Sequence, residues 1–233
     1  MREALPSNRR PAEDRGVERV LIVLAKAPVP GRVKTRLCPP ATPEQAAGLA
    51  AAALADTLAA ALRVPAAQVV VALDGEPDPA LAAALEGTTV IAQRGGELGE
   101  RIAAAHADVA RLAPGACTVL IGMDTPQLDP AVLGRCLDAV SDPDGPDALL
   151  GPAVDGGWWA LALRNPHDAE LVRRVPASRS DTGARTLAAL EAAGLRVAGM
   201  PALTDVDTMV DAHAVARACP GSRFATLLAA VGA

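Results

Sequence analysis

Val119-Leu120-Ile121-Gly122-Met123-Asp124-Thr125-Pro126 is the stretch that decides the fold. Its apolar run stops at Gly122 and a proline follows soon after, which is typical of a buried strand that ends abruptly. Asp124 therefore comes just past the carboxyl end of a strand, where ligands bind in open α/β sheets. A carboxylate at that place suits Mg²⁺ or Mn²⁺ that holds a substrate's phosphates. The alternative is that Asp124 caps the helix expected near Pro130.

The composition excludes several classes of protein. The chain has 233 residues and a formal net charge of −5, which argues against nucleic-acid partners because binding to a phosphate backbone needs a basic face. No apolar run approaches the roughly 20 residues of a membrane span, and no signal peptide is expected. The four cysteines lack the spacing of a zinc site and are expected to be reduced thiols of a cytoplasmic protein. Nothing in the sequence points to a particular oligomeric state or to a membrane partner.

One domain is expected after a short tail. Residues 1–17 are rich in Arg, Glu and Pro without an apolar period, which predicts disorder. Residues 18–233 contain no internal repeat and alternate strands with helices, which predicts a three-layer α/β/α sandwich with a mostly parallel sheet. The expected strands are 19–25, 69–73, 88–92, the run from 119, 148–152, 157–163 and 196–200. The expected helices are 42–62, 79–85, one that ends near 112, 130–140, 168–175 and 182–193, with one or two short helices after 208.

A basic loop follows the first strand. Residues 26–37 contain two prolines and a glycine, which exclude a regular element. Such a loop can hold phosphates with backbone N–H groups while cationic side chains neutralise them. It is not a Walker A loop, because Val33 stands where the glycine before the lysine is required. The alternative is an exposed, solvated loop. The cations are Lys26, Arg32, Lys34 and Arg36.

Three further segments carry candidate site residues. Residues 94–101 combine glycines with charges, and they either approach a ligand or form a strand-to-helix turn. Asp155-Gly156-Gly157 places a carboxylate in a tight turn that water or a metal-bound substrate could approach, and at least one of the two tryptophans after it is expected in the core. Asp205 and Asp207 alternate along an extended segment, so both carboxylates could face one site. Asp207 or Thr208 would also suit a helix N-cap.

Five segments together resemble one family. The family is the bacterial glycosyltransferase-like domain of unknown function 2064, which looks like a branch of the nucleotide-diphospho-sugar transferase (GT-A) superfamily. The resemblance runs from about residue 19 to about residue 218, and it implies a GT-A fold, a nucleotide bound over the first strands, and a divalent metal, Mg²⁺ or Mn²⁺. The segments are residues 25–37, 98–101, 122–126, 151–157 and 205–208.

The resemblance implies roles for individual residues. Asp124 resembles the metal-binding aspartate of the superfamily, and Asp207 or Asp205 resembles the second ligand. The expected catalytic residues are Asp124, Lys34 and Asp155, and the acceptor or sugar side would be formed by Asp155, Gly156 and Gly157. The expected nucleotide and phosphate contacts are Ala25, Lys26, Gly31, Lys34, Thr35, Arg36, Asp74, Arg94, Gly99, Arg101 and Gly122.

Two departures from the family pattern bear on the reaction. Trp158 stands where the family usually has Tyr, and the Asp-x-Asp triplet of many glycosyltransferases reads Asp124-Thr125-Pro126. We expect a metal-dependent glycosyltransferase that uses a nucleotide-sugar donor and a small-molecule acceptor. The alternatives are a guanylyltransferase-like nucleotidyltransferase that uses a nucleoside triphosphate, a non-catalytic nucleotide-binding protein, and a structural protein that has lost the site.

Overall fold

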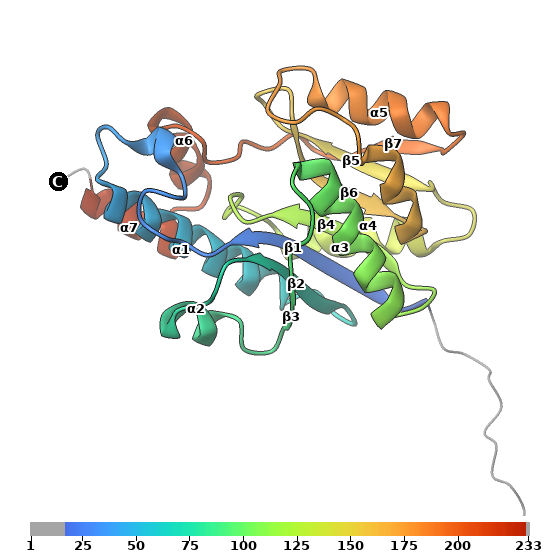
Figure 1. Cartoon of the computed structure of the whole chain (residues 1–233), viewed down its shortest axis with the longest axis horizontal. Helices are drawn as coiled ribbons and strands as arrows, with labels where there is room; N and C mark the ends of the chain where they lie inside the picture. The colour runs from blue at the N-terminus through green and yellow to red at the C-terminus, as the bar shows by residue number, and fades with distance from the viewer. Residues whose placement is uncertain (1–16, 232–233) are drawn as a thin grey trace, which may run out of the picture.

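The computed structural model describes residues 17–231, so the tail expected over 1–17 lies outside the described residues except for its last residue. One sheet has the strand order β3-β2-β1-β4-β6-β5-β7 (Figure 1). β6 is antiparallel to both of its neighbours and the other neighbouring pairs are parallel, which confirms the mostly parallel sheet. The strands are β1 (Arg19–Lys26), β2 (Gln68–Asp74), β3 (Thr89–Ala92), β4 (Cys117–Gly122), β5 (Ala148–Pro152), β6 (Trp158–Leu163) and β7 (Val197–Gly199).

The helices lie on both faces of this sheet. They are α1 (Pro43–Ala61), α2 (Pro79–Ala84), α3 (Leu98–Leu112), α4 (Pro130–Ser141), α5 (Thr182–Ala192), α6 (Met209–Ala218) and α7 (Arg223–Val231), with the 3₁₀ helices η1 (Thr35–Leu37) and η2 (Pro166–Val172). Successive side chains of a strand point to opposite faces. Leu21 and Val23 of β1 accordingly pack with α1, α2 and α4, whereas Val20 and Ile22 pack with α3, η2 and α5. This arrangement is the expected three-layer sandwich. No helix within residues 17–231 combines the length and the apolar character needed to cross a membrane.

Two short segments differ from the predictions. The helix expected over 168–175 is present as the 3₁₀ helix η2, which begins and ends earlier than expected. Asn165 caps it by accepting a hydrogen bond from the N–H of His167 (3.2 Å), and Pro166 takes the first helical position. Within the basic loop, where no regular element was expected, η1 forms one turn that buries Leu37.

A third apolar cluster supports the basic loop and the C-terminal helices together. Leu37 from η1, Leu49 from α1 and Phe224 from α7 are fully buried in it, and Val206 from the segment before α6 is 2% exposed in the same cluster. As a result, α7 lies beside α1 and α6 lies beside α7, both away from α5 (Figure 1). The chain segments that carry Lys34 and Asp207 therefore rest on one common core.

Asp56 of α1 holds the start of α7 in this cluster. Its carboxylate accepts hydrogen bonds from the backbone N–H groups of Arg223 (3.2 Å) and Phe224 (2.9 Å). Loss of such a cap costs about 0.5–2 kcal/mol. We expect Asp56→Ala to lower the free energy of unfolding in urea by about that amount, whereas Asp138→Ala, which removes an exposed ion pair with Arg19, should cost about 0–1 kcal/mol. Equal losses in both variants would contradict the capping role.

Candidate active site

The candidate site lies at the edge of the sheet where β1 and β4 end. These two strands are parallel neighbours, so the basic loop after β1 and the Asp124 loop after β4 leave the sheet side by side. β6 runs antiparallel to β4 with Ala160 opposite Ile121, so the turn that precedes β6 returns to the same edge. The topology thus brings Asp155 to the edge that carries Asp124.

A third segment crosses this edge before α6. The N–H of Leu203 donates to the carbonyl of Pro152 (3.1 Å), and the N–H of Val206 donates to the carbonyl of Asp124 (3.0 Å). Val206 points into the third apolar cluster, while Asp205 and Asp207 on either side of it line a cavity. The alternation expected for an extended segment therefore brings both carboxylates to one place.

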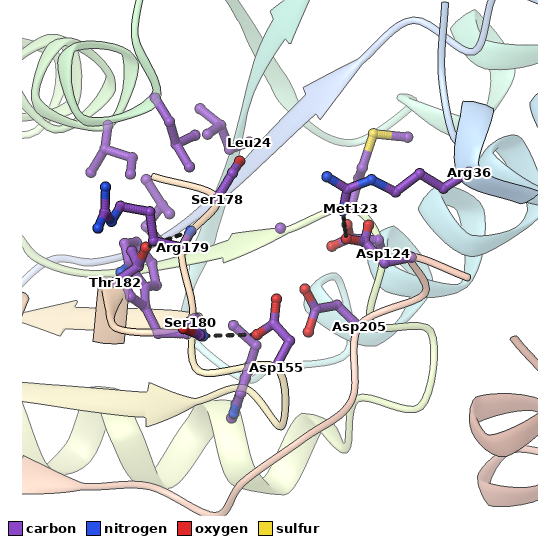
Figure 2. A pocket seen from close by; sticks show the side chains of 18 residues that line it. Leu24, Arg36, Met123, Asp124, Asp155, Ser178, Arg179, Ser180, Thr182 and Asp205 are labelled. Carbon is purple, nitrogen blue, oxygen red and sulfur yellow. Dashed lines mark hydrogen bonds and ion pairs between the residues drawn. The ribbon is translucent and has the colours of Figure 1, made fainter. Parts of the chain in front are cut away.

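The cavity has a volume of about 470 Å³ (Figure 2). Carboxylates from three separate chain segments line it: Asp124, Asp155, Asp205 and Asp207. The side chains of Asp155 and Asp205 point toward the same space (Figure 2). The apolar lining comes from Leu24, Leu98, Ile102, Leu120, Met123, Trp158 and Trp159, and the other lining residues are Arg36, Gly122, Gly157, Ser178, Arg179, Ser180 and Thr182.

A second cavity, of about 300 Å³, adjoins the first and shares Arg36, Met123, Asp124 and Asp207 with it. Its remaining lining belongs to the basic loop and to α1: Lys26, Arg32, Val33, Lys34, Thr35 and Ala50. The four cations of the loop therefore face a cavity together. We call the first the acidic cavity and the second the basic cavity.

Lys34 lies on the basic side of the residues that both cavities share. Its Nζ lies 2.6 Å from Oδ2 of Asp124 and 3.2 Å from Oδ1 of Asp207, and its side chain is 13% exposed. Arg36 pairs with the other oxygen of Asp207 (3.0 Å). Burial alone would lower the pKa of Lys34, but the carboxylates of Asp124 and Asp207 outweigh burial and raise the pKa above its ordinary value. The backbone of Lys34 is left-handed, with φ 45° and ψ 40°, a conformation that is uncommon outside glycine and clusters at functional sites.

Neighbouring residues take the structural roles that Asp124 and Asp207 were alternatively expected to have. Asp129 caps α4 by accepting a backbone hydrogen bond in its first turn (2.8 Å). Thr208 caps α6 in the same way (3.3 Å). The carboxylates of Asp124 and Asp207 thus face Lys34 instead of a helix end.

Asp205 carries uncompensated negative charge. Burial raises its pKa to about 6, and the like charges of Asp124, Asp155 and Asp207 add to this effect. Carboxylate oxygens are the ligands that Mg²⁺ and Mn²⁺ prefer, and a bound cation would relieve the repulsion. No three His, Cys, Asp or Glu side chains within residues 17–231 converge closely enough to hold a metal by themselves. A site of two carboxylates completed by substrate phosphates needs no third ligand of this kind, so the donor set fits the expected metal.

The raised pKa of Asp205 makes the stability of the metal-free protein depend on pH. Its folded pKa of about 6 exceeds the ordinary value of 3.8, so the folded state binds the proton more tightly than the unfolded chain. This contribution to stability is complete below the ordinary pKa and is lost as the pH rises through the folded pKa. We expect Asp205→Asn, which cannot ionise, to gain stability relative to wild type between pH 4 and pH 7. Urea unfolding in EDTA measures this difference, and a difference that is constant with pH would contradict it.

The Asp155-Gly156-Gly157 turn packs against the loop between η2 and α5. The N–H of Gly183 donates to the carbonyl of Gly156 (2.9 Å), and a Cβ on Gly156 would overlap the carbonyl of Ser180. Gly156 therefore makes room for the backbone of this loop, whereas Gly157 lines the acidic cavity. The carboxylate of Asp155 is exposed, lines the acidic cavity and accepts a hydrogen bond from the N–H of Gly157 (2.8 Å).

Several predicted nucleotide contacts lie outside the lining of both cavities: Ala25, Gly31, Asp74, Arg94, Gly99 and Arg101. Arg94 pairs with Asp108 of α3 (2.6 Å), and Arg101 pairs with Asp74 (3.0 Å). A Cβ on Gly99 would overlap the carbonyl oxygen of Val172, so this glycine permits close packing of α3 on η2. Residues 94–97 connect β3 to α3 and residues 98–101 form the first turn of α3, where the Glu100 carboxylate completes a capping box.

The loop of residues 178–182 belongs to the site, although no sequence motif identifies it. Ser178, Arg179, Ser180 and Thr182 form the wall of the acidic cavity that lies across from Asp124 and Arg36 (Figure 2). The hydroxyl of Thr182 donates to the carbonyl of Pro176 (3.0 Å), which fixes the loop ahead of α5. The only available signal was a short polar run that ends in a glycine.

The two tryptophans have different environments. Trp159 is buried, and its Nε1–H donates to the carbonyl of Pro201 (3.0 Å), which confirms that one of the pair belongs to the core. Trp158 is half-buried in the lining of the acidic cavity, and its Nε1–H donates to the hydroxyl of Thr186 (3.1 Å). With that polar group satisfied, Trp158 contributes chiefly apolar surface to the cavity.

Solved structures resemble this chain over most of its length. A candidate nucleotide-diphospho-sugar transferase from Desulfovibrio desulfuricans is 26% identical with a TM-score of 0.78, over 92% of this chain and 95% of that chain. Rv0371c from Mycobacterium tuberculosis in complex with manganese is 23% identical with a TM-score of 0.52, over 85% and 98%. CMP:2-keto-3-deoxy-manno-octonic acid synthetase complexed with CTP is 16% identical with a TM-score of 0.53, over 84% and 96%. The last two show the fold alone, and the first supports the prediction that the chain is a transferase.

The family comparison covers the centre of the chain. No curated protein shows significant sequence similarity to it. A family model described as an uncharacterized protein conserved in bacteria (DUF2064) matches residues 57–179, which include Asp124 and the Asp155-Gly156-Gly157 turn. The basic loop and Asp207 lie outside the matched range, and the fold brings them to the same cavities. With more than half of its sequence matched and a nucleotide-diphospho-sugar transferase fold, this chain belongs to the family of domain of unknown function 2064.

Proposed function

We propose that the protein is a metal-dependent glycosyltransferase that uses a nucleotide-sugar donor and a small-molecule acceptor. The observation that carries this proposal is the cluster of Lys34, Asp124 and Asp207 between a basic and an acidic cavity at the strand ends. The diphosphate of a nucleotide sugar requires cations, and the metal bound to it requires carboxylates. Here a cation, Lys34, and two carboxylates lie within contact distance of one another. The similarity to a candidate nucleotide-diphospho-sugar transferase and the manganese in Rv0371c support the same class of reaction.

The basic cavity would hold the diphosphate of the donor. When the bond between the sugar carbon and the phosphate oxygen breaks, negative charge builds up on the departing nucleoside diphosphate. Lys26, Lys34 and Arg36 are placed around the cavity to stabilise this charge. Asp124, with Asp207 or Asp205, would hold Mg²⁺ or Mn²⁺, which when bound neutralises charge on the phosphates.

The acidic cavity would hold the sugar and the acceptor. The acceptor hydroxyl loses a proton as its oxygen bonds to the sugar carbon, and Asp155 is positioned to accept that proton because its exposed carboxylate faces the cavity. The N–H of Gly157 fixes the orientation of this carboxylate. Leu98 and Trp158 offer apolar surface against which a ring can lie.

Nucleotidyl transfer is the second candidate function. The loop after β4 favours it. Many glycosyltransferases have the triplet Asp-x-Asp, whereas this chain has Asp124-Thr125-Pro126, in which Thr125 is buried and the second aspartate is missing. The second carboxylate of the site comes instead from residues 205–207. In this reaction Lys26, Lys34 and Arg36 would stabilise a departing pyrophosphate.

The leaving group distinguishes these reactions. The protein would be incubated with a panel of nucleotide sugars and nucleoside triphosphates, in Mg²⁺, Mn²⁺ or EDTA, with a bacterial small-molecule extract as the source of acceptor. Metal-dependent release of a nucleoside diphosphate is the result that glycosyl transfer predicts, and release of pyrophosphate is the result that nucleotidyl transfer predicts. Equal release in EDTA would contradict the metal dependence, and no release from any donor would contradict both reactions.

A further inference from the structure

Lys34 stands in the place that the proposed metal would take. Its ammonium is 2.6 Å from Asp124 and 3.2 Å from Asp207, so it is bound to both of the carboxylates that belong to the candidate metal site. Mg²⁺ binds carboxylate oxygens at about 2.0–2.1 Å. A divalent ion bound between these two carboxylates would therefore meet a second positive charge at a few ångströms, and the two cations exclude one another.

The ammonium of Lys34 could also bind in the basic cavity. Lys34 lines the basic cavity but not the acidic one, and the phosphates of a nucleotide would lie on the basic side. Its side chain is a flexible four-carbon stem, while its backbone is held in the left-handed conformation at the start of η1. A small movement of Nζ would exchange two carboxylate partners for phosphate oxygens without any change in the loop.

Arg36 does not have the same effect on the metal site. It pairs with Asp207 alone (3.0 Å), its side chain is 69% exposed, and it makes no ion pair with Asp124. Such a solvated pair is screened by water and costs little to break. Lys34, which is 13% exposed and shared by both carboxylates, is the cation that competes with a metal ion.

We propose that Lys34 is a displaceable internal counter-ion. Its ammonium pairs with the carboxylates of Asp124 and Asp207 in the nucleotide-free protein, and it moves to the phosphates when nucleotide and metal bind. The inference rests on the proposed function, because it takes Asp124 and Asp207 as metal ligands. Lys34 then has two successive sets of partners, the carboxylates and the phosphates, and metal and nucleotide each increase the affinity for the other. Thermodynamic linkage requires the two increases in affinity to be equal.

Two binding constants measured on the free protein test this. The first is the affinity for Mn²⁺ without nucleotide, followed by the electron paramagnetic resonance signal of unbound Mn²⁺. The second is the affinity for inorganic pyrophosphate in EDTA, followed by calorimetry. We expect Lys34→Met to bind Mn²⁺ about tenfold more tightly than wild type, because a nearby positive charge has been removed, and to bind pyrophosphate more weakly. Lys34→Arg, which keeps the charge, should bind Mn²⁺ much as wild type does.

Lys26→Met is the matched control. Lys26 lines the basic cavity, is exposed and makes no ion pair among the described residues. Its replacement should weaken pyrophosphate binding and leave Mn²⁺ affinity within about twofold of wild type, because it does not contact Asp124 or Asp207. Lys34→Gln, which keeps a polar side chain, provides a second uncharged variant if circular dichroism shows that Lys34→Met is not folded.

The outcomes separate the inference from the proposed function. Unchanged or weaker Mn²⁺ binding in folded Lys34→Met and Lys34→Gln would overturn the counter-ion role, while metal-dependent turnover by the wild type would leave the proposed function in place. An equal gain in Mn²⁺ affinity in Lys26→Met would overturn it as well, since the effect would then be one of overall charge. Absence of Mn²⁺ binding in every variant would overturn both.

Discussion

Asp124→Asn is expected to lower the rate of transfer by about 10²–10³-fold, the magnitude of losing one preorganised charge at a reacting centre. The carboxylate of Asp124 touches Lys34 and lies at the boundary of both cavities, so its loss affects the metal and the ammonium together. The backbone of the variant should remain in place, because the carbonyl of Asp124 still accepts the hydrogen bond from Val206 (3.0 Å). Steady-state kinetics with saturating Mn²⁺ measures the effect.

The control for this variant is Asp138→Asn. Asp138 lies on α4, is largely exposed and pairs with Arg19, away from both cavities. We expect it to keep wild-type activity. Turnover by Asp124→Asn within about tenfold of wild type, at an unchanged melting temperature, would mean that the carboxylate supplies less than about 1.4 kcal/mol to the reaction and is not the metal anchor.

Gly156→Ala is expected to lower the free energy of unfolding by about 2–5 kcal/mol, the sum of a strained backbone and a steric overlap. Gly156 has φ +90°, and an added Cβ would overlap the backbone carbonyl of Ser180. Ser180 belongs to the wall of the acidic cavity, so relief of the overlap would displace that wall from Asp155. Urea unfolding gives the stability, and the Michaelis constant for the acceptor reports the displaced wall.

Two other glycines separate the causes. Gly194 has φ +86° and open space around its Cβ position, so Gly194→Ala isolates the backbone strain. Gly221 has open space and no positive φ, so Gly221→Ala should be close to neutral. If Gly156→Ala costs no more than Gly194→Ala, the contact between the glycine turn and the 178–182 loop does not determine the structure of the site.

The sheet could be predicted from sequence because its strands are local signals. The apolar run of β1 is covered on both faces, and the run before Gly122 ends in glycine and proline, so each marks a strand by itself. The site residues at the strand ends followed from the same signals, because Asp124 and the basic loop are placed by where β4 and β1 stop.

The other features of the candidate site depend on contacts between distant residues, which no local sequence pattern encodes. In sequence, Lys34 is separated from Asp124 by 90 residues and from Asp207 by 173. The sequence therefore predicts a phosphate-binding lysine and two metal ligands, but it does not show that the lysine pairs with both carboxylates. The resemblance implies a nucleotide contact for Arg94, and no local pattern shows that its guanidinium pairs with Asp108 of α3. The 178–182 loop was missed because short polar runs are common in loops of every kind.

A thermal-shift panel tests the central claim most directly. Nucleoside triphosphates and nucleotide sugars would each be added to wild type and to Asp124→Asn, with Mg²⁺, Mn²⁺ or EDTA. A ligand at about 100 times its dissociation constant stabilises a fold by roughly 2.7 kcal/mol, which gives a clear shift. We predict a shift with at least one nucleotide ligand that needs the metal and disappears in Asp124→Asn. A shift that is the same in EDTA and in Asp124→Asn, or no shift with any ligand, would contradict a metal-dependent nucleotide site at the ends of β1 and β4.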